Sequence, residues 1–152
     1  MSPRILFRSV AIAEAITWTG LISAMLLKYV VKADFGQHAV SIAGGVHGFV
    51  FLAFGMTVLL VGVNQRWNIG LLAVGVASAV IPYAAVVFDV WTDKTGRLNG
   101  PWQRVATADR RDHTWYARLL RWMLRHPVLL AIGAAVVLVG VFTVLLIGGP
   151  PV

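Results

Sequence analysis

The chain has 152 residues, of which 59% are hydrophobic and 12% are charged, and its mean hydropathy is +0.80. Soluble domains are roughly 45–50% apolar and about 25% charged, so this composition excludes a soluble globular protein and indicates an integral membrane protein. The net charge is +7, and the lack of cysteine excludes disulfides, thiolate metal sites, iron–sulfur clusters and cysteine nucleophiles.

Four apolar runs are each long enough to cross a membrane, because a hydrocarbon core of ~30 Å needs about 20 helical residues. The runs do not alternate apolar with polar residues, as the strands of a membrane β-barrel would. The sequence therefore predicts an all-α membrane protein with four transmembrane helices in an antiparallel bundle. Its spans are expected at about 5–31, 39–63, 68–90 and 128–147.

These runs divide the chain into three parts. Residues 1–93 are predicted to form a three-helix membrane unit, residues 94–127 a basic linker, and residues 128–152 the fourth transmembrane helix with a short tail. With four spans, the first and third loops share one side and carry ten Lys or Arg, against three on the other side. The positive-inside rule then predicts that both termini lie outside and that the 91–127 linker lies in the cytoplasm.

The second half of the linker has the pattern of a short amphipathic helix at about 114–126. Trp115, Leu119 and Trp122 fall on one stripe and several arginines on another, which is typical of a helix that lies in the membrane interface. Nucleic acid is not an expected partner, since topology alone requires a basic cytoplasmic loop. The residues expected to contact anionic lipid are Arg118, Arg121 and Arg125.

Ionisable side chains inside a bilayer cost ~2.5–3.5 kcal/mol on insertion scales, so each is a candidate functional residue. Glu14, Lys28, His47 and Asp89 fall within or at the edges of the apolar runs. Lys28 and Asp89 both lie roughly 15 Å from the centre of their spans on the cytoplasmic side, which predicts an interfacial ion pair. Glu14 has three open interpretations: a structural carboxyl that joins helices, a site for protons or ions, or a contact with a partner.

His47 shares a helix face with several glycines, so it is expected in a seam where two helices approach closely, on the side where Glu14 is also expected. It is either a neutral structural histidine or part of a functional site. No second histidine lies inside a span, so no metal or cofactor is expected. The glycines predicted to allow close helix packing are Gly44, Gly48, Gly55, Gly75, Gly133 and Gly140.

Three short motifs resemble a known family. Ala13-Glu14-Ala15, Leu27-Lys28-Tyr29 and Gly45-x-His47-Gly48 occur in the order found in domain of unknown function 3817, a family of small bacterial integral membrane proteins. The similarity covers roughly residues 5–95. It implies a compact three-helix unit of the bacterial inner (plasma) membrane with no assigned activity, to which this chain adds its linker and last span.

The sequence contains no phosphate loop, nucleotide fingerprint, zinc-peptidase motif or nucleophile elbow, so a non-enzymatic protein is expected. The favoured function is an accessory or assembly subunit of a larger membrane complex, with a respiratory oxidase as a host by analogy only. One alternative is a small oligomeric channel or transporter with Glu14 and His47 as a proton relay. Another is a lipid-binding scaffold that acts through Arg118, Arg121 and Arg125.

Overall fold

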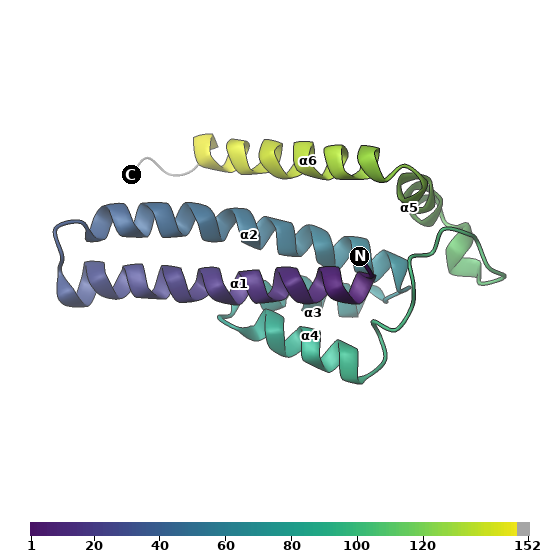
Figure 1. The fold of residues 1–152 in the computed structure, drawn as a ribbon, viewed down its shortest axis with the longest axis horizontal. Helices are drawn as coiled ribbons and strands as arrows, with labels where there is room; N and C mark the ends of the chain where they lie inside the picture. The colour runs from purple at the N-terminus through teal and green to yellow at the C-terminus, as the bar shows by residue number, and fades with distance from the viewer. Residues whose placement is uncertain (149–152) are drawn as a thin grey trace.

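The structure is a computed structural model, and it describes residues 1–148. These residues form helices and no strand, in agreement with the all-α prediction. Figure 1 shows the helices in order: α1 (Pro3–Leu26), α2 (Gly36–Asn64), α3 (Ile69–Ala77), α4 (Ala84–Lys94), α5 (Trp115–Arg125) and α6 (Pro127–Gly148).

The two longest helices, α1 and α2, form an antiparallel hairpin along the length of the molecule (Figure 1). A π-helical segment, Leu27–Val31, extends α1, and Lys32 then takes a left-handed conformation with φ of 56° to turn the chain. The turn is tight, since a Cβ atom added to Gly36 would lie 2.7 Å from the Lys28 Cα atom. Each arm of the hairpin has 29 residues and is apolar enough to cross a bilayer.

The third apolar run does not form one helix. α3 ends in a 3-10 turn at Ser78–Val80, Ile81 is extended, and Tyr83 is left-handed with φ of 66° before α4 begins. Pro82 explains the break, because proline lacks an N–H and disfavours a helical conformation in the residue before it. The predicted single helix over 68–90 is therefore wrong. Three helices, α1 with its extension, α2 and α6, are long and apolar enough to span a membrane, so the four predicted spans are not confirmed.

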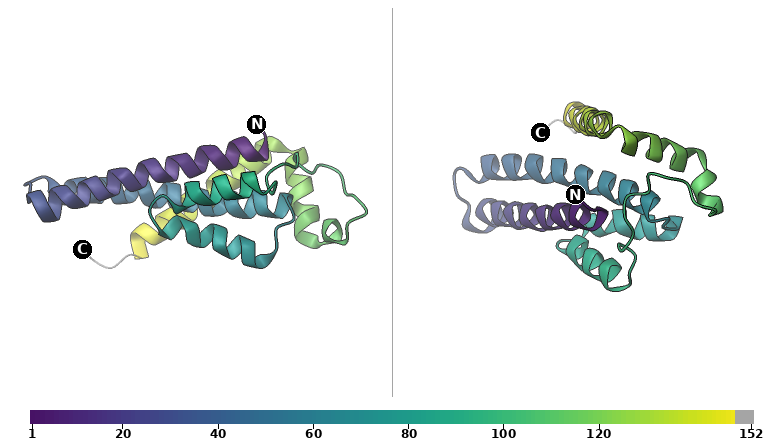
Figure 2. Two further views of the ribbon diagram at one scale, coloured as in Figure 1. Left: turned by 90° about the horizontal axis from the view of Figure 1, so that it is seen from below. Right: turned by 45° about the vertical axis from the view of Figure 1, so that its right-hand side comes forward.

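After the break, α4 runs back along α1. The start of α3 and the end of α4 therefore lie at the same end of the molecule (Figures 1 and 2). Trp18 of α1 contacts the break through the Ala79 carbonyl, and Arg8 of α1 pairs with Asp89 of α4 at 2.9 Å. The expected pair of Lys28 and Asp89 is therefore wrong. A straight third helix would have brought Asp89 level with Lys28, whereas the reversal returns it to the start of α1.

The same reversal places the N-terminus beside the linker. Trp102 donates a hydrogen bond of 2.8 Å from Nε1 to the Met1 carbonyl, and Arg4 bonds to Asn99 and forms an ion pair with Asp93. The prediction that the N-terminus and the linker lie on opposite sides of the membrane is wrong. Three helices that are long and apolar enough to span a membrane, rather than four, lie between the N-terminus and the C-terminal end of α6.

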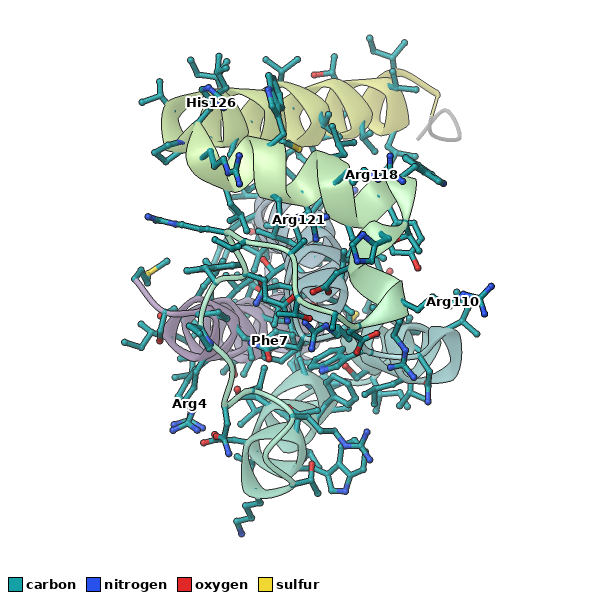
Figure 3. The ribbon with its side chains drawn as sticks, turned by 90° about the vertical axis from the view of Figure 1, so that its right-hand side faces the viewer. Arg4, Phe7, Arg110, Arg118, Arg121 and His126 are labelled. Carbon is teal, nitrogen blue, oxygen red and sulfur yellow. The ribbon has the colours of Figure 1, made fainter. Side chains whose placement is uncertain are left out.

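Aromatic rings fill the core at the linker end. Phe7 packs against Phe54, Trp67 and Phe88 with ring centroids 5.6, 5.8 and 6.0 Å away, and Figure 3 shows Phe7 among the helices that surround it. Gly75 of α3 faces this core. The absence of a side chain at Gly75 lets α3 approach α2 and α4, so the core joins the α3–α4 hairpin to the two spans.

α6 forms a separate layer beside α2 (Figures 1 and 2), and none of its described residues is buried. Its contacts with α2 include the edge-on packing of Phe142 against Phe49, with ring centroids 5.6 Å apart. α5 lies across the linker end, where the linker pattern predicted an amphipathic helix. The α1–α4 core and α6 are therefore two distinct parts of the molecule.

Replacing Gly75 with alanine tests the packing of the α3–α4 hairpin. The new Cβ atom would lie 2.8 Å from Val58 and 3.1 Å from Phe88, so we expect the free energy of unfolding to fall by about 1–3 kcal/mol. Gly133→Ala is the matched control, because a Cβ there meets nothing within 4 Å and alanine favours a helix. Thermal unfolding in one detergent compares them, and equal midpoints would contradict this packing.

Candidate functional site

Glu14 lies in the middle of α1, on the face that packs against α2. Its side chain is 1% exposed, and neither carboxyl oxygen has a hydrogen-bond partner in the structure. A buried polar atom without a partner costs free energy, and the cost is greater where the surroundings are hydrocarbon. The geometry therefore gives Glu14 no structural bond that would account for its position.

His47 is the ionisable group nearest to Glu14. Its Nδ1 atom lies 3.9 Å from Glu14 Oε2, which is too far for a hydrogen bond, and 3.1 Å from the Thr17 hydroxyl. The Thr17 hydroxyl also lies 3.0 Å from the Glu14 backbone carbonyl, so it connects His47 to the backbone beside Glu14. A small movement of either side chain would bring the imidazole and the carboxyl together.

Trp18 connects this pair to the break in the third apolar run. Its ring packs on the His47 ring with centroids 4.4 Å apart, and its Nε1 donates to the Ala79 carbonyl at 3.1 Å. The Ala79 carbonyl lies in the 3-10 turn, where the regular helical bonding of α3 stops. The intramembrane cluster of Glu14, Thr17, Trp18 and His47 thus joins α1, α2 and the interrupted helix.

The sequence predicted Glu14 and His47 in one seam, and the structure brings them together. Trp18 was not identified from the sequence as part of the site, although it lies four residues after Glu14 on the same helix face. Among the described residues, no group of three or more His, Asp or Glu side chains is close enough to hold a metal. A carboxyl and an imidazole at this distance can exchange a proton.

The predicted packing glycines differ in their surroundings. Gly75 is closely approached, whereas a Cβ atom at Gly44 or Gly48 would make ordinary contacts of 4.0 Å with Leu21 or 3.8 Å with Phe142. The closest approach of all is at Gly62, which the sequence analysis did not single out. At Gly55, Gly133 and Gly140 an added Cβ atom would meet nothing within 4 Å among residues 1–148. The packing role of these three glycines stays a prediction.

The three predicted lipid-binding arginines all donate to backbone carbonyls of the linker. Arg121 is buried and bonds to the Asp112 carbonyl, and Figure 3 shows it between α5 and the rest of the chain. Arg118 and Arg125 are more exposed and bond to the carbonyls of His113 and Arg104. Arg121 therefore holds the linker in place, and only the other two remain open to lipid.

A partly buried ion pair fixes the linker to the end of α2. Arg66 Nη2 lies 2.8 Å from Asp112 Oδ2, and Thr107 donates to the same carboxyl from its amide and its hydroxyl. Arg66, with help from Thr107, holds the pKa of Asp112 well below its ordinary range. The Asp112 carboxylate thus stays charged, so Arg66 is neutralised within the chain.

Residues 5–94 match the family described as "Domain of unknown function (DUF3817)". The chain belongs to the DUF3817 family. The resemblance inferred from the motifs is thereby confirmed, and the match ends at the last residue of α4. The DUF3817 unit of this chain therefore comprises α1–α4, with two long helices and an interrupted third, while the linker, α5 and α6 lie outside the match.

A curated relative is "Putative membrane protein SCO5905" of Streptomyces coelicolor. It is 34% identical over 96 residues, which are 62% of this chain but 11% of the relative. The match thus spans about a tenth of the length of that relative. No solved structure matches the chain.

Replacing Glu14 with methionine tests whether its carboxyl stabilises the fold. Removing two unsatisfied buried oxygens is expected to raise the free energy of unfolding by about 1–3 kcal/mol. Thr17→Val should instead lower it by about 0.5–1.5 kcal/mol, because His47 loses its partner. Thermal unfolding in one detergent measures both. A Glu14→Met variant less stable than Thr17→Val would show that the carboxyl has a structural bond.

Proposed function

We propose that this DUF3817 protein is a non-enzymatic accessory or assembly subunit of a larger membrane complex in the bacterial plasma membrane. The observation that carries this proposal is the match to SCO5905, which corresponds to 11% of a much longer protein named as a membrane protein. In that relative the matched unit is a small part of a long chain, which supports a unit that works beside other membrane segments.

The form of α6 supports this proposal. The helix has no ionisable residue, no buried residue and apolar side chains on all sides, so it can contact lipid or another apolar helix around most of its surface. Gly140 is open to its surroundings, and a glycine on a transmembrane helix lets a second backbone approach closely. α6 is therefore the segment that we expect to contact a partner.

We also infer the orientation of the chain. The end of the molecule that carries the N-terminus and the linker holds 11 of the 13 Lys and Arg residues, and the opposite end holds Lys28 and Lys32. The positive-inside rule favours the end with 11 in the cytoplasm. Three spans then direct the C-terminal end of α6 to the outside.

A second candidate function, proton transfer, is favoured by the separation of 3.9 Å between Glu14 and His47. A carboxyl inside a membrane that makes no hydrogen bond is a candidate site for binding and releasing protons. Proteoliposomes with a pH-sensitive dye test this function. It requires a flux that Glu14→Gln and His47→Ala both reduce, and it is excluded if the parent protein carries no flux.

Substitution of Gly140 tests the accessory role. We expect the parent protein, extracted in a mild detergent, to migrate on native gels within a larger assembly. Gly140→Leu should release it, because an added Cβ atom meets nothing within 4 Å in residues 1–148 and the longer side chain is expected to obstruct a neighbour. Val139→Leu, on a different face of α6, is the control. A parent protein that migrates only as a monomer or homo-oligomer would contradict the proposal.

A further inference from the structure

The turn between α3 and α4 is an exposed part of the molecule. Its break segment, Val80–Tyr83, joins the end of the 3-10 turn to the start of α4. Val80, Ile81 and Tyr83 are 63%, 62% and 45% exposed. α6 cannot cover them, because it lies beside α2 on the opposite side of the α1–α2 hairpin from α4 (Figures 1 and 2).

The break segment lies near the middle of the bilayer. Trp18 donates to the carbonyl of Ala79, the residue before the segment, and Trp18 lies within one residue of the midpoint of the arm Pro3–Val31. The length of α3 agrees, because a helical rise from Ile69 to Ala79 is about 15 Å, half of a ~30 Å hydrocarbon core. Acyl chains therefore surround the break segment unless another molecule covers it.

Several backbone groups of the break segment have no hydrogen-bond partner among residues 1–148. They are the N–H groups of Ile81 and Tyr83 and the carbonyls of Val80 and Pro82. The Ile81 carbonyl, in contrast, accepts from the Ala84 amide at 3.1 Å. Irregular backbone at this depth occurs only where protein or water covers it, because hydrocarbon offers no donor or acceptor. The break segment therefore needs partners that residues 1–148 do not supply.

A face of α1 with small and hydroxyl side chains adjoins the break segment. The Thr19 hydroxyl lies 3.2 Å from the Tyr83 hydroxyl, and Ser23 follows one turn later on the same side of α1. Thr19, Gly20 and Ser23 are exposed, and a Cβ atom added to Gly20 would meet nothing within 4 Å among the described residues. Residues of these types are enriched where transmembrane helices approach each other closely. This face therefore extends the exposed surface of the break segment along α1.

The unpaired backbone groups favour a second copy of this chain as the partner. A regular transmembrane helix uses its backbone N–H and C=O groups internally, and acyl chains have none, so neither offers backbone partners. The break segment of a second copy carries the same unpaired donors and acceptors. Two segments related by a two-fold axis can pair the N–H groups of one with the carbonyls of the other. Two-fold dimers are also the commonest symmetric assemblies, and an axis along the membrane normal keeps both copies in one orientation.

We propose that two copies of this chain form a parallel dimer in the membrane through their break segments, with the Thr19–Ser23 face of α1 beside them. The dimer leaves α6 free for a host complex, because α6 lies on the opposite side of the α1–α2 hairpin (Figure 1). It does not depend on the accessory role, since a chain that acts without a host could form the same dimer.

Cysteine cross-linking of the full-length protein in native membranes tests the proposal. The chain has no cysteine, so Val80→Cys, Ile81→Cys and Val136→Cys can each be introduced singly and oxidised with copper phenanthroline. A disulfide needs Cβ atoms about 3.5–4.5 Å apart, so only residues close to the two-fold axis can form one. We expect Val80→Cys or Ile81→Cys to shift from the 16.5 kDa monomer to a band of twice that mass. Val136→Cys is the control, because residue 136 is 65% exposed on α6 and should stay monomeric.

Variants of Gly20 locate the interface on α1. In the variant that cross-links, Gly20→Leu should abolish the dimer band because its side chain obstructs the second copy, whereas Gly140→Leu on α6 should leave the band unchanged. Ser23→Leu obstructs the same face if Gly20→Leu does not fold. A monomer band for both break-segment variants, or an equal dimer band for Val136→Cys, would overturn the proposal. A product of another mass would assign the surface to a different protein, and reaction of Ile81→Cys with a membrane-impermeant maleimide would assign it to water; either would also overturn it.

Discussion

Pro82 interrupts an apolar run that is otherwise long enough to cross a membrane, and the arrangement of the other elements depends on this break. A chain in hydrocarbon must satisfy its backbone groups internally, so a break of this kind is tolerated only where protein surrounds it. Here Trp18 of α1 satisfies one backbone group of the break, because its Nε1 donates to the Ala79 carbonyl. The reversal then returns α4 to the start of α1, where Arg8 meets Asp89.

The same break gives the intramembrane cluster its setting. Trp18 contacts His47 on one side and the 3-10 turn on the other. A movement of the His47 side chain can therefore displace the α3–α4 hairpin through Trp18. Discontinuous helices beside a buried ionisable residue are typical of ion sites in membrane transporters. The DUF3817 unit thus has a polar centre, while the linker, α5 and α6 supply a basic surface and an apolar helix.

Periodicity and composition predicted the helical class, the first two spans, the last span and the shared seam of Glu14 and His47. They failed at the third run because hydropathy measures apolar length and not continuity, although Pro82 was visible near its centre. The wrong Lys28 and Asp89 pair and the predicted separation of the N-terminus from the linker both follow from that failure. The bonds of Arg121 and Asp112 to distant parts of the linker depend on tertiary folding, which no local pattern encodes.

The central claim is that the third run enters and leaves the membrane on one side. The chain has no cysteine, so Ser2→Cys, Asp34→Cys and Ala106→Cys can each be labelled singly with a membrane-impermeant maleimide in oriented vesicles. The structure predicts that residues 2 and 106 react from one side and residue 34 from the other. Labelling of residues 34 and 106 from the same side, with residue 2 on the opposite side, would contradict the account.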